Sequence, residues 1–131
     1  MLGRDIHDTA QVSRRESLRL LLIEHDEAFA RTISGMLDQA RETVGSVVAV
    51  PSLAEALSLI SREEFGVILL EFFMPDGAGL ANIAVLQEAA PHTPIIVLGA
   101  ADDETIAVEA VHAGAQDYLV KGQINPSWLL R

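Results

Sequence analysis

Four side chains that could do chemistry follow the apolar runs of this sequence. Glu71 ends the segment VILLE, Glu24 and His25 follow LRLLLI, and Lys121 follows DYLV. Carboxylates, an imidazole and an ammonium are groups that hold a cation, move a proton or bind a phosphoryl group. Because these residues lie far apart along the chain, they can act together only if the fold carries the ends of several segments to one place.

The segment around Glu71 indicates which kind of fold would do so. Residues 67–70 are a continuous run of branched apolar side chains, and after Glu71 the chain breaks into MPDGAG. A short apolar run closed by proline and glycine is typical of a strand that is buried on both faces and ends at a loop. In open parallel α/β sheets, ligands bind at the carboxyl ends of the strands. Glu71 is therefore expected at the functional edge of a central strand.

Strands and helices are expected to alternate along the chain. Further strands are expected at residues 18–23, 46–50, 95–98 and 117–120. Helices are expected to follow Asp26, Ser52 and either Asp102 or Asp103, and to span about Leu80 to Ala90 and Asn125 to Arg131. This alternation predicts an α/β fold, a doubly wound five-stranded parallel sheet of the flavodoxin-like (βα)5 kind with strand order 2-1-3-4-5. The last helix is expected to be truncated.

Capping residues and apolar spacing define most of these helices. Asp26 can cap the first helix, and Ser52 with Glu55 forms a capping box for the second. Pro91 is expected to stop the third helix and Gly114 the fourth. The apolar stripes are expected to contain Phe29, Ile33, Met36, Leu37 and Ala40 in the first helix, Leu53, Ala56, Leu57 and Ile60 in the second, and Leu80, Ile83, Ala84 and Leu86 or Gln87 in the third.

The composition limits the classes of protein to consider. The chain has 131 residues, a formal net charge of -10 and no cysteine. We expect a flexible leader at residues 1–17 and a single domain at 18–131. No apolar run approaches the roughly 20 residues of a membrane span, Lys and Arg form no dense cluster, and no signal peptide is recognisable. The expectation is a cytoplasmic domain that binds neither membrane nor nucleic acid.

Four segments together resemble the receiver domain of two-component response regulators, the CheY-like family. They are LLIEHDEAF, VILLEFFMPDGAGL, TPIIVLGA and AGAQDYLVKG, and the resemblance runs from about Leu18 to Trp128. In this family an Asp at the end of the third strand accepts a phosphoryl group. An acidic pair after the first strand holds a divalent cation, a Ser or Thr follows the fourth strand, and a Lys follows the fifth.

The resemblance assigns a family position to each of the candidate residues. It implies the phosphoacceptor position at Glu71, the acidic pair at Glu24 and His25, the hydroxyl position at Gly99, the aromatic switch at Tyr118 and the phosphate-contacting lysine at Lys121. Lys121 is the only lysine, since the other eight basic residues are arginine. The residues at 71, 25 and 99 depart from the family pattern.

Each departure has a physical consequence. Glu71 carries its carboxylate one methylene farther than Asp, and positioning supplies most of phosphoryl-transfer catalysis. His25 offers an imidazole where Mg²⁺ requires oxygen ligands, and Gly99 has no hydroxyl to donate. We therefore expect that the Mg²⁺ site is lost, that no cofactor is bound, and that Glu71 forms a permanent ion pair with Lys121. His25, beside Glu24, is expected to be biased toward imidazolium.

These expectations favour a non-enzymatic signalling module, a pseudo-receiver that binds a protein partner without accepting phosphate. By resemblance, the partner is a sensor kinase or an output domain. It would bind the face made by the helix after Asp102 or Asp103, the strand at 117–120 and the helix at 125–131. A homodimer is a further possibility, because a truncated last helix would leave apolar surface and Trp128 uncovered.

Other functions stay open at this stage. In a working phosphoreceiver, Glu71 or Asp76 would accept the phosphoryl group from a histidine kinase. His25 with Glu24 and Glu71 could hold a transition metal. The residues Glu24-His25-Asp26 faintly resemble the nucleophile loop of haloacid-dehalogenase-type phosphatases, and FMN binding is disfavoured by the acidic loop. Three smaller expectations are that His7, His92 and His112 face solvent, that Phe72, Phe73 and Met74 either form a partner patch or pack back, and that the Lys121–Gly122 bond is trans.

Overall fold

The fold is a five-stranded parallel sheet, seen in a computed structural model that describes residues 18–38, 45–77, 79–99 and 104–124. The strand order is β2-β1-β3-β4-β5, which confirms the predicted topology. The strands are β1 (Arg19–Ile23), β2 (Ser46–Val50), β3 (Val67–Glu71), β4 (Ile95–Gly99) and β5 (Asp117–Val120). The predicted bounds agree with these to within one residue.

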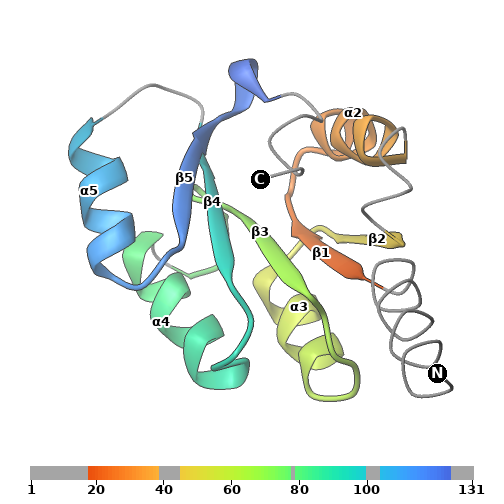
Figure 1. Ribbon diagram of the computed structural model, residues 1–131, viewed down its shortest axis with the longest axis horizontal. Helices are drawn as coiled ribbons and strands as arrows, with labels where there is room; N and C mark the ends of the chain where they lie inside the picture. The colour runs from red at the N-terminus through yellow and green to blue at the C-terminus, as the bar shows by residue number, and fades with distance from the viewer. Residues whose placement is uncertain (1–17, 39–44, 78, 100–103, 125–131) are drawn as a thin grey trace, which may run out of the picture.

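Helices cover both faces of the sheet, as Figure 1 shows, with α3, α4 and α5 on one side and α2 on the other. Their bounds are α2 (Glu27–Asp38), α3 (Leu53–Ile60), α4 (Gly79–Ala89) and α5 (Glu104–His112), and the 3-10 turn η1 (Lys121–Gln123) follows β5. None of the helices described is long and apolar enough to cross a membrane.

The core is divided by the sheet into two apolar clusters. In β3, Ile68 and Leu70 belong to the cluster under α3, α4 and α5, whereas Leu69 belongs to the cluster under α2. Successive side chains of a strand point to opposite faces, so a strand with helices on both sides must be apolar throughout. This explains the uninterrupted run that precedes Glu71.

Two of the predicted helix caps are confirmed. The Asp26 carboxylate accepts hydrogen bonds from the Ala28 and Phe29 N–H groups at 3.0 and 3.2 Å. The Ser52 hydroxyl accepts one from the Glu55 N–H at 3.1 Å. The predictions for residues 1–17, Ala40, Asp102, Asp103 and the helix at 125–131 lie outside the described residues.

The predicted stripe of α4 is wrong at one position. Ile83 and Leu86 are buried, but Ala84 is exposed and Asn82 is buried in its place. The reason is the loop before α4, because the Asn82 amide donates to the Asp76 carbonyl at 3.5 Å and fills the space beside Gly77. A polar residue can be buried here because the loop backbone provides an acceptor for its amide.

Candidate functional site

The carboxyl ends of β1, β3 and β5 bring the predicted chemical groups to one edge of the sheet. Ile23 pairs in register with Leu70, so Glu24 and Glu71 leave adjacent strands at the same level. Lys121 follows the last residue of β5, and its peptide bond to Gly122 is trans, as expected. The parallel topology thus accounts for the convergence of groups that are remote in sequence.

The Lys121 ammonium lies between the two glutamates. Its Nζ is 2.8 Å from Glu24 Oε1 and also contacts Glu71 Oε2. The glutamate side chains are buried, at 0% and 3% exposure, and that of Lys121 is 17% exposed. The predicted contact between Glu71 and Lys121 is present, and Glu24 is a second partner that was not predicted. From the sequence, Glu24 is expected only as half of an acidic pair.

The remaining oxygen of each glutamate is held by the backbone. The Asp26 N–H donates to Glu24 Oε2 at 3.1 Å, and the Phe73 N–H donates to Glu71 Oε1 at 3.0 Å. Each carboxylate therefore has one oxygen on a loop amide and the other on the ammonium. This division fixes both side chains in orientation.

For Glu24 and for Lys121, burial shifts the pKa in one direction and the hydrogen bond between the two residues shifts it in the other. Burial raises the pKa of Glu24, and the hydrogen bonds from Lys121 and Asp26 only partly offset that effect. For Lys121, burial acts to lower the pKa, but the bonds to Glu24 and Glu71 outweigh it and raise the pKa above its usual value. The ammonium is therefore firmly protonated at neutral pH.

Phe29 completes the surroundings of the ammonium. Lys121 Nζ lies 4.5 Å from the centroid of the Phe29 ring on α2, which is a cation–π contact. The sequence pattern predicts Phe29 only as part of the apolar stripe of its helix. The signal available was its position in the first turn after Asp26, which directs a helical side chain back toward the preceding loop.

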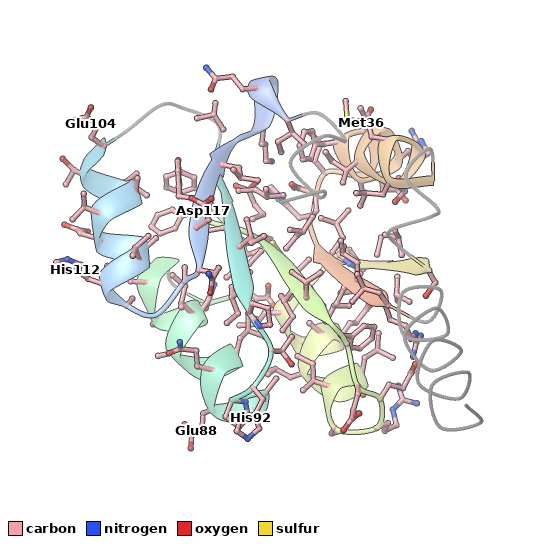
Figure 2. All side chains as sticks on the ribbon, viewed as in Figure 1. Met36, Glu88, His92, Glu104, His112 and Asp117 are labelled. Atoms are coloured by element: carbon pink, nitrogen blue, oxygen red, sulfur yellow. The ribbon has the colours of Figure 1, made fainter. Side chains whose placement is uncertain are left out.

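His25 lies at the outer side of the cluster. Its Nδ1 is 3.7 Å from Glu24 Oε2, and the side chain is exposed. Its bias toward imidazolium stays a prediction. The other described histidines, His92 and His112, are exposed as expected, and Figure 2 shows both at the periphery of the molecule.

Asp76 in the loop between β3 and α4 has a structural role that the sequence pattern does not predict. Its two carboxylate oxygens accept hydrogen bonds from the Leu53 and Ala54 N–H groups, each at 3.1 Å. The Leu53 bond, reinforced by that from Ala54, holds the pKa of Asp76 below its usual value in spite of some burial. Asp76 thus caps α3 from a different loop.

Gly99 and Tyr118 are adjacent at the end of β4. Tyr118 pairs in register with Val97, two residues before Gly99 on the same face of the sheet. A Cβ atom built on Gly99 would overlap the Tyr118 hydroxyl. The positions that resemble the family's hydroxyl and aromatic residues are therefore in direct contact.

The aromatic residues after Glu71 separate into packed and exposed groups. Met74 is buried, Phe72 is half-buried, and Phe73 is 57% exposed. The Phe72 and Phe73 rings make an edge-to-face contact with centroids 4.9 Å apart. Of the two alternatives, packing back applies to Met74 and to Phe72, which packs against the same apolar cluster, whereas Phe73 is mostly exposed beside the site.

This donor set does not fit Mg²⁺. Glu24 and Glu71 each already place one oxygen against the ammonium, and the Asp26 carboxylate caps α2. A third candidate ligand, His25, is an imidazole, whereas Mg²⁺ binds oxygen ligands in octahedral geometry. Among the described residues, no group of three or more His, Cys, Asp or Glu side chains is arranged to hold a metal ion.

Comparison with known proteins identifies the family of the chain. Residues 20–130 match the family model described as the response regulator receiver domain. The chain is 33% identical over 103 residues to the response regulator protein FleR of Pseudomonas aeruginosa, an alignment that covers 79% of this chain and 21% of FleR. It is also 33% identical over 105 residues to the cell cycle transcriptional regulator CtrA of Caulobacter vibrioides, covering 79% of this chain and 44% of CtrA.

Solved structures show the same relationship. A response regulator protein from Burkholderia pseudomallei, whose crystal structure contains a phosphorylated aspartic acid, a calcium ion and citrate, is 31% identical to this chain. The two align with a TM-score of 0.74 over 87% of this chain and 65% of that one. The chain spans about a fifth of the length of FleR and less than half of the length of CtrA.

Proposed function

This chain belongs to the response regulator receiver domain family, and we propose that it is a member that signals by binding a protein partner without accepting a phosphoryl group. One observation carries the proposal. The Lys121 ammonium lies against both Glu24 and Glu71, the residues at the family's cation-binding and acceptor positions. The site thus contains its own cation in contact with its own carboxylates.

The state of Glu71 supports this proposal. An acceptor carboxylate must direct one free oxygen in line with the donor phosphorus. Both Glu71 oxygens are engaged, one with the Phe73 N–H and the other with Lys121. Attack would require breaking an ion pair of low exposure, and the freed charge would be costly to leave unpaired.

Asp76 is a poor substitute acceptor for a similar reason. Its two oxygens are both bonded to the first turn of α3. Phosphorylation there would remove the cap that joins the loop to α3.

The proposed partner is a sensor kinase or an output domain, in keeping with the transcriptional regulator CtrA among the relatives. The proposed contact face includes α5 and β5, together with residues 125–131, which lie outside the described part. Val108 and Val111 of α5 are 55% and 46% exposed, which gives this face apolar contact area. A homodimer is the other assembly that we propose, and the proposed compartment is the cytoplasm.

Intact-mass spectrometry tests the proposed function. The protein is incubated with acetyl phosphate and Mg²⁺, and the receiver domain of the Burkholderia pseudomallei protein, whose structure contains a phosphorylated aspartic acid, serves as a positive control. We expect the control to gain about 80 Da and this chain to gain nothing. A stoichiometric gain of that mass, mapped to Glu71 or Asp76, would establish a working phosphoreceiver instead.

A further inference from the structure

Gly99 and Tyr118 fit together in a way that neither residue explains alone. The space that a side chain at position 99 would occupy is filled by the outer part of the Tyr118 ring, because a Cβ there would overlap both the hydroxyl and the ring carbons next to it. Since Tyr118 pairs with Val97, its ring must lean along the strand direction to reach Gly99. The contact is thus a diagonal one between neighbouring strands.

The backbone of Gly99 does not require glycine. The described glycines with positive φ are Gly77, Gly79 and Gly114, and Gly99 is not among them. Gly99 is a buried strand residue in regular register with Val120. Glycine is unfavourable inside a strand, so the close approach of the Tyr118 ring is the structural reason for its presence.

Tyr118 is also held from its other side. It is half-buried and packs against the apolar cluster that lies under α3, α4 and α5. The ring therefore has core contacts along one side and also lies over the backbone of Gly99. An outward rotation would expose ring surface and open a void over Gly99.

We propose that Gly99 locks Tyr118 in the inward position, so that the surface formed by β5 and α5 has one fixed shape. The inference rests on the proposed function, since a phosphorylation-driven switch requires this surface to change. It goes beyond that function because it names Gly99 and Tyr118 as the residue pair that fixes the shape of the surface. The partner would then bind a surface that is already formed, without the cost of populating a minor state.

Fluorine NMR of the ring tests the lock directly. Tyr118 is the only tyrosine, so 3-fluorotyrosine labelling gives a probe of this one side chain. We expect a resonance with a small solvent isotope shift in the wild-type protein, and a larger, solvent-exposed shift in Gly99→Ser. A wild-type ring as exposed as in urea-unfolded protein, or no change in Gly99→Ser, would overturn the lock.

A double-mutant cycle provides a second test that does not depend on spectral assignment. In the wild-type background, Gly99→Ala should raise the unfolding equilibrium constant by about tenfold or more through overpacking. In a Tyr118→Ala background the same change should have an effect within about twofold, because the overlapping ring is gone. Gly122→Ala is the matched control, because a Cβ there meets nothing within 4 Å.

The results separate this inference from the proposed function. Equal effects of Gly99→Ala in the two backgrounds would refute the lock, whatever the intact mass shows. A phosphorylated chain whose ring stays inward would refute the proposed function and leave the lock standing. Coupling between the two positions, with an inward ring that acetyl phosphate does not move, supports both.

Discussion

At the scale of single residues, the central feature is the Lys121 ammonium held by two buried carboxylates. Glu24, Glu71 and Lys121 form a set with one positive and two negative formal charges, and Phe29 covers the ammonium. Burying charges is unfavourable unless each is paired. Removing the ammonium would leave two carboxylates facing each other with no counter-charge, so Lys121 is expected to have the largest single effect on stability at this edge.

Replacement of Lys121 by methionine tests this expectation. We expect Lys121→Met to lower the free energy of unfolding by about 3 kcal/mol, as is typical when one partner of a buried ion pair is removed. Urea denaturation at pH 7 measures the change. Arg31→Gln on the exposed side of α2 removes the same formal charge with similar helix propensity, and it should stay within about 0.5 kcal/mol of wild type.

Neutralising the two glutamates should reverse most of that loss. In the triple variant Lys121→Met, Glu24→Gln, Glu71→Gln, no buried charge is left without a partner, and the amide oxygens can still accept from the Asp26 and Phe73 N–H groups. If the triple variant is no more stable than Lys121→Met, the loss comes from packing of the lysine stem and not from charge.

At the scale of elements, the loop between β3 and α4 is joined to α3 by Asp76. The Asp76 carboxylate and the Ser52 hydroxyl both cap the first turn of α3, but only Asp76 titrates. The loop that follows Glu71 is thereby held at its start by the contact between Glu71 and Lys121, and farther along by the bonds from Asp76 to α3. This arrangement links the ion-paired edge of β3 to the helix that follows β2.

The link predicts a stability difference that depends on pH. The pKa of Asp76 is lowered in the folded state, so its contribution is complete above the unfolded pKa of about 3.9 and is lost as pH falls through the lower folded value. Asp76→Ala should cost about 1 kcal/mol at pH 7, and this cost should vanish in acid. Ser52→Ala, measured in parallel, should have a similar cost at every pH. A constant cost for Asp76→Ala would contradict a carboxylate cap.

Much of this element-scale architecture could be predicted from sequence. The uninterrupted run before Glu71 required a strand with helices on both faces, and Asp26 and Ser52 gave helix starts that the structure confirms. The stripe of α4 was mispredicted at Ala84, because apolar spacing cannot anticipate that the preceding loop offers a carbonyl to Asn82.

The site could be predicted in outline only. Glu24, Glu71 and Lys121 could be placed at one edge, because a parallel topology brings the residues that follow all strands to the same edge of the sheet. Which carboxylate the ammonium contacts depends on side-chain reach, and it contacts both. The overlap of Tyr118 with the space above Gly99 depends on the lean of one ring across two strands, which periodicity does not encode.

At the scale of the whole molecule, the chain is a module that relatives carry within longer proteins, since it spans 21% of FleR and 44% of CtrA. Under the proposed function, Lys121 takes the place at this edge that a cation and an incoming phosphoryl group would need. Signalling under this function therefore depends on contact surfaces, among them the face of α5 and β5.

The most direct measurement is thermal unfolding with Mg²⁺ and beryllofluoride, an analogue of the phosphoryl group. A ligand that binds only the folded state raises the unfolding temperature with its concentration. We predict no rise for this chain and a clear rise for the receiver domain of the Burkholderia pseudomallei protein, whose structure contains a phosphorylated aspartic acid. An unfolding temperature of this chain that climbs with beryllofluoride only when Mg²⁺ is present would show that its carboxylates still receive both, contrary to the account.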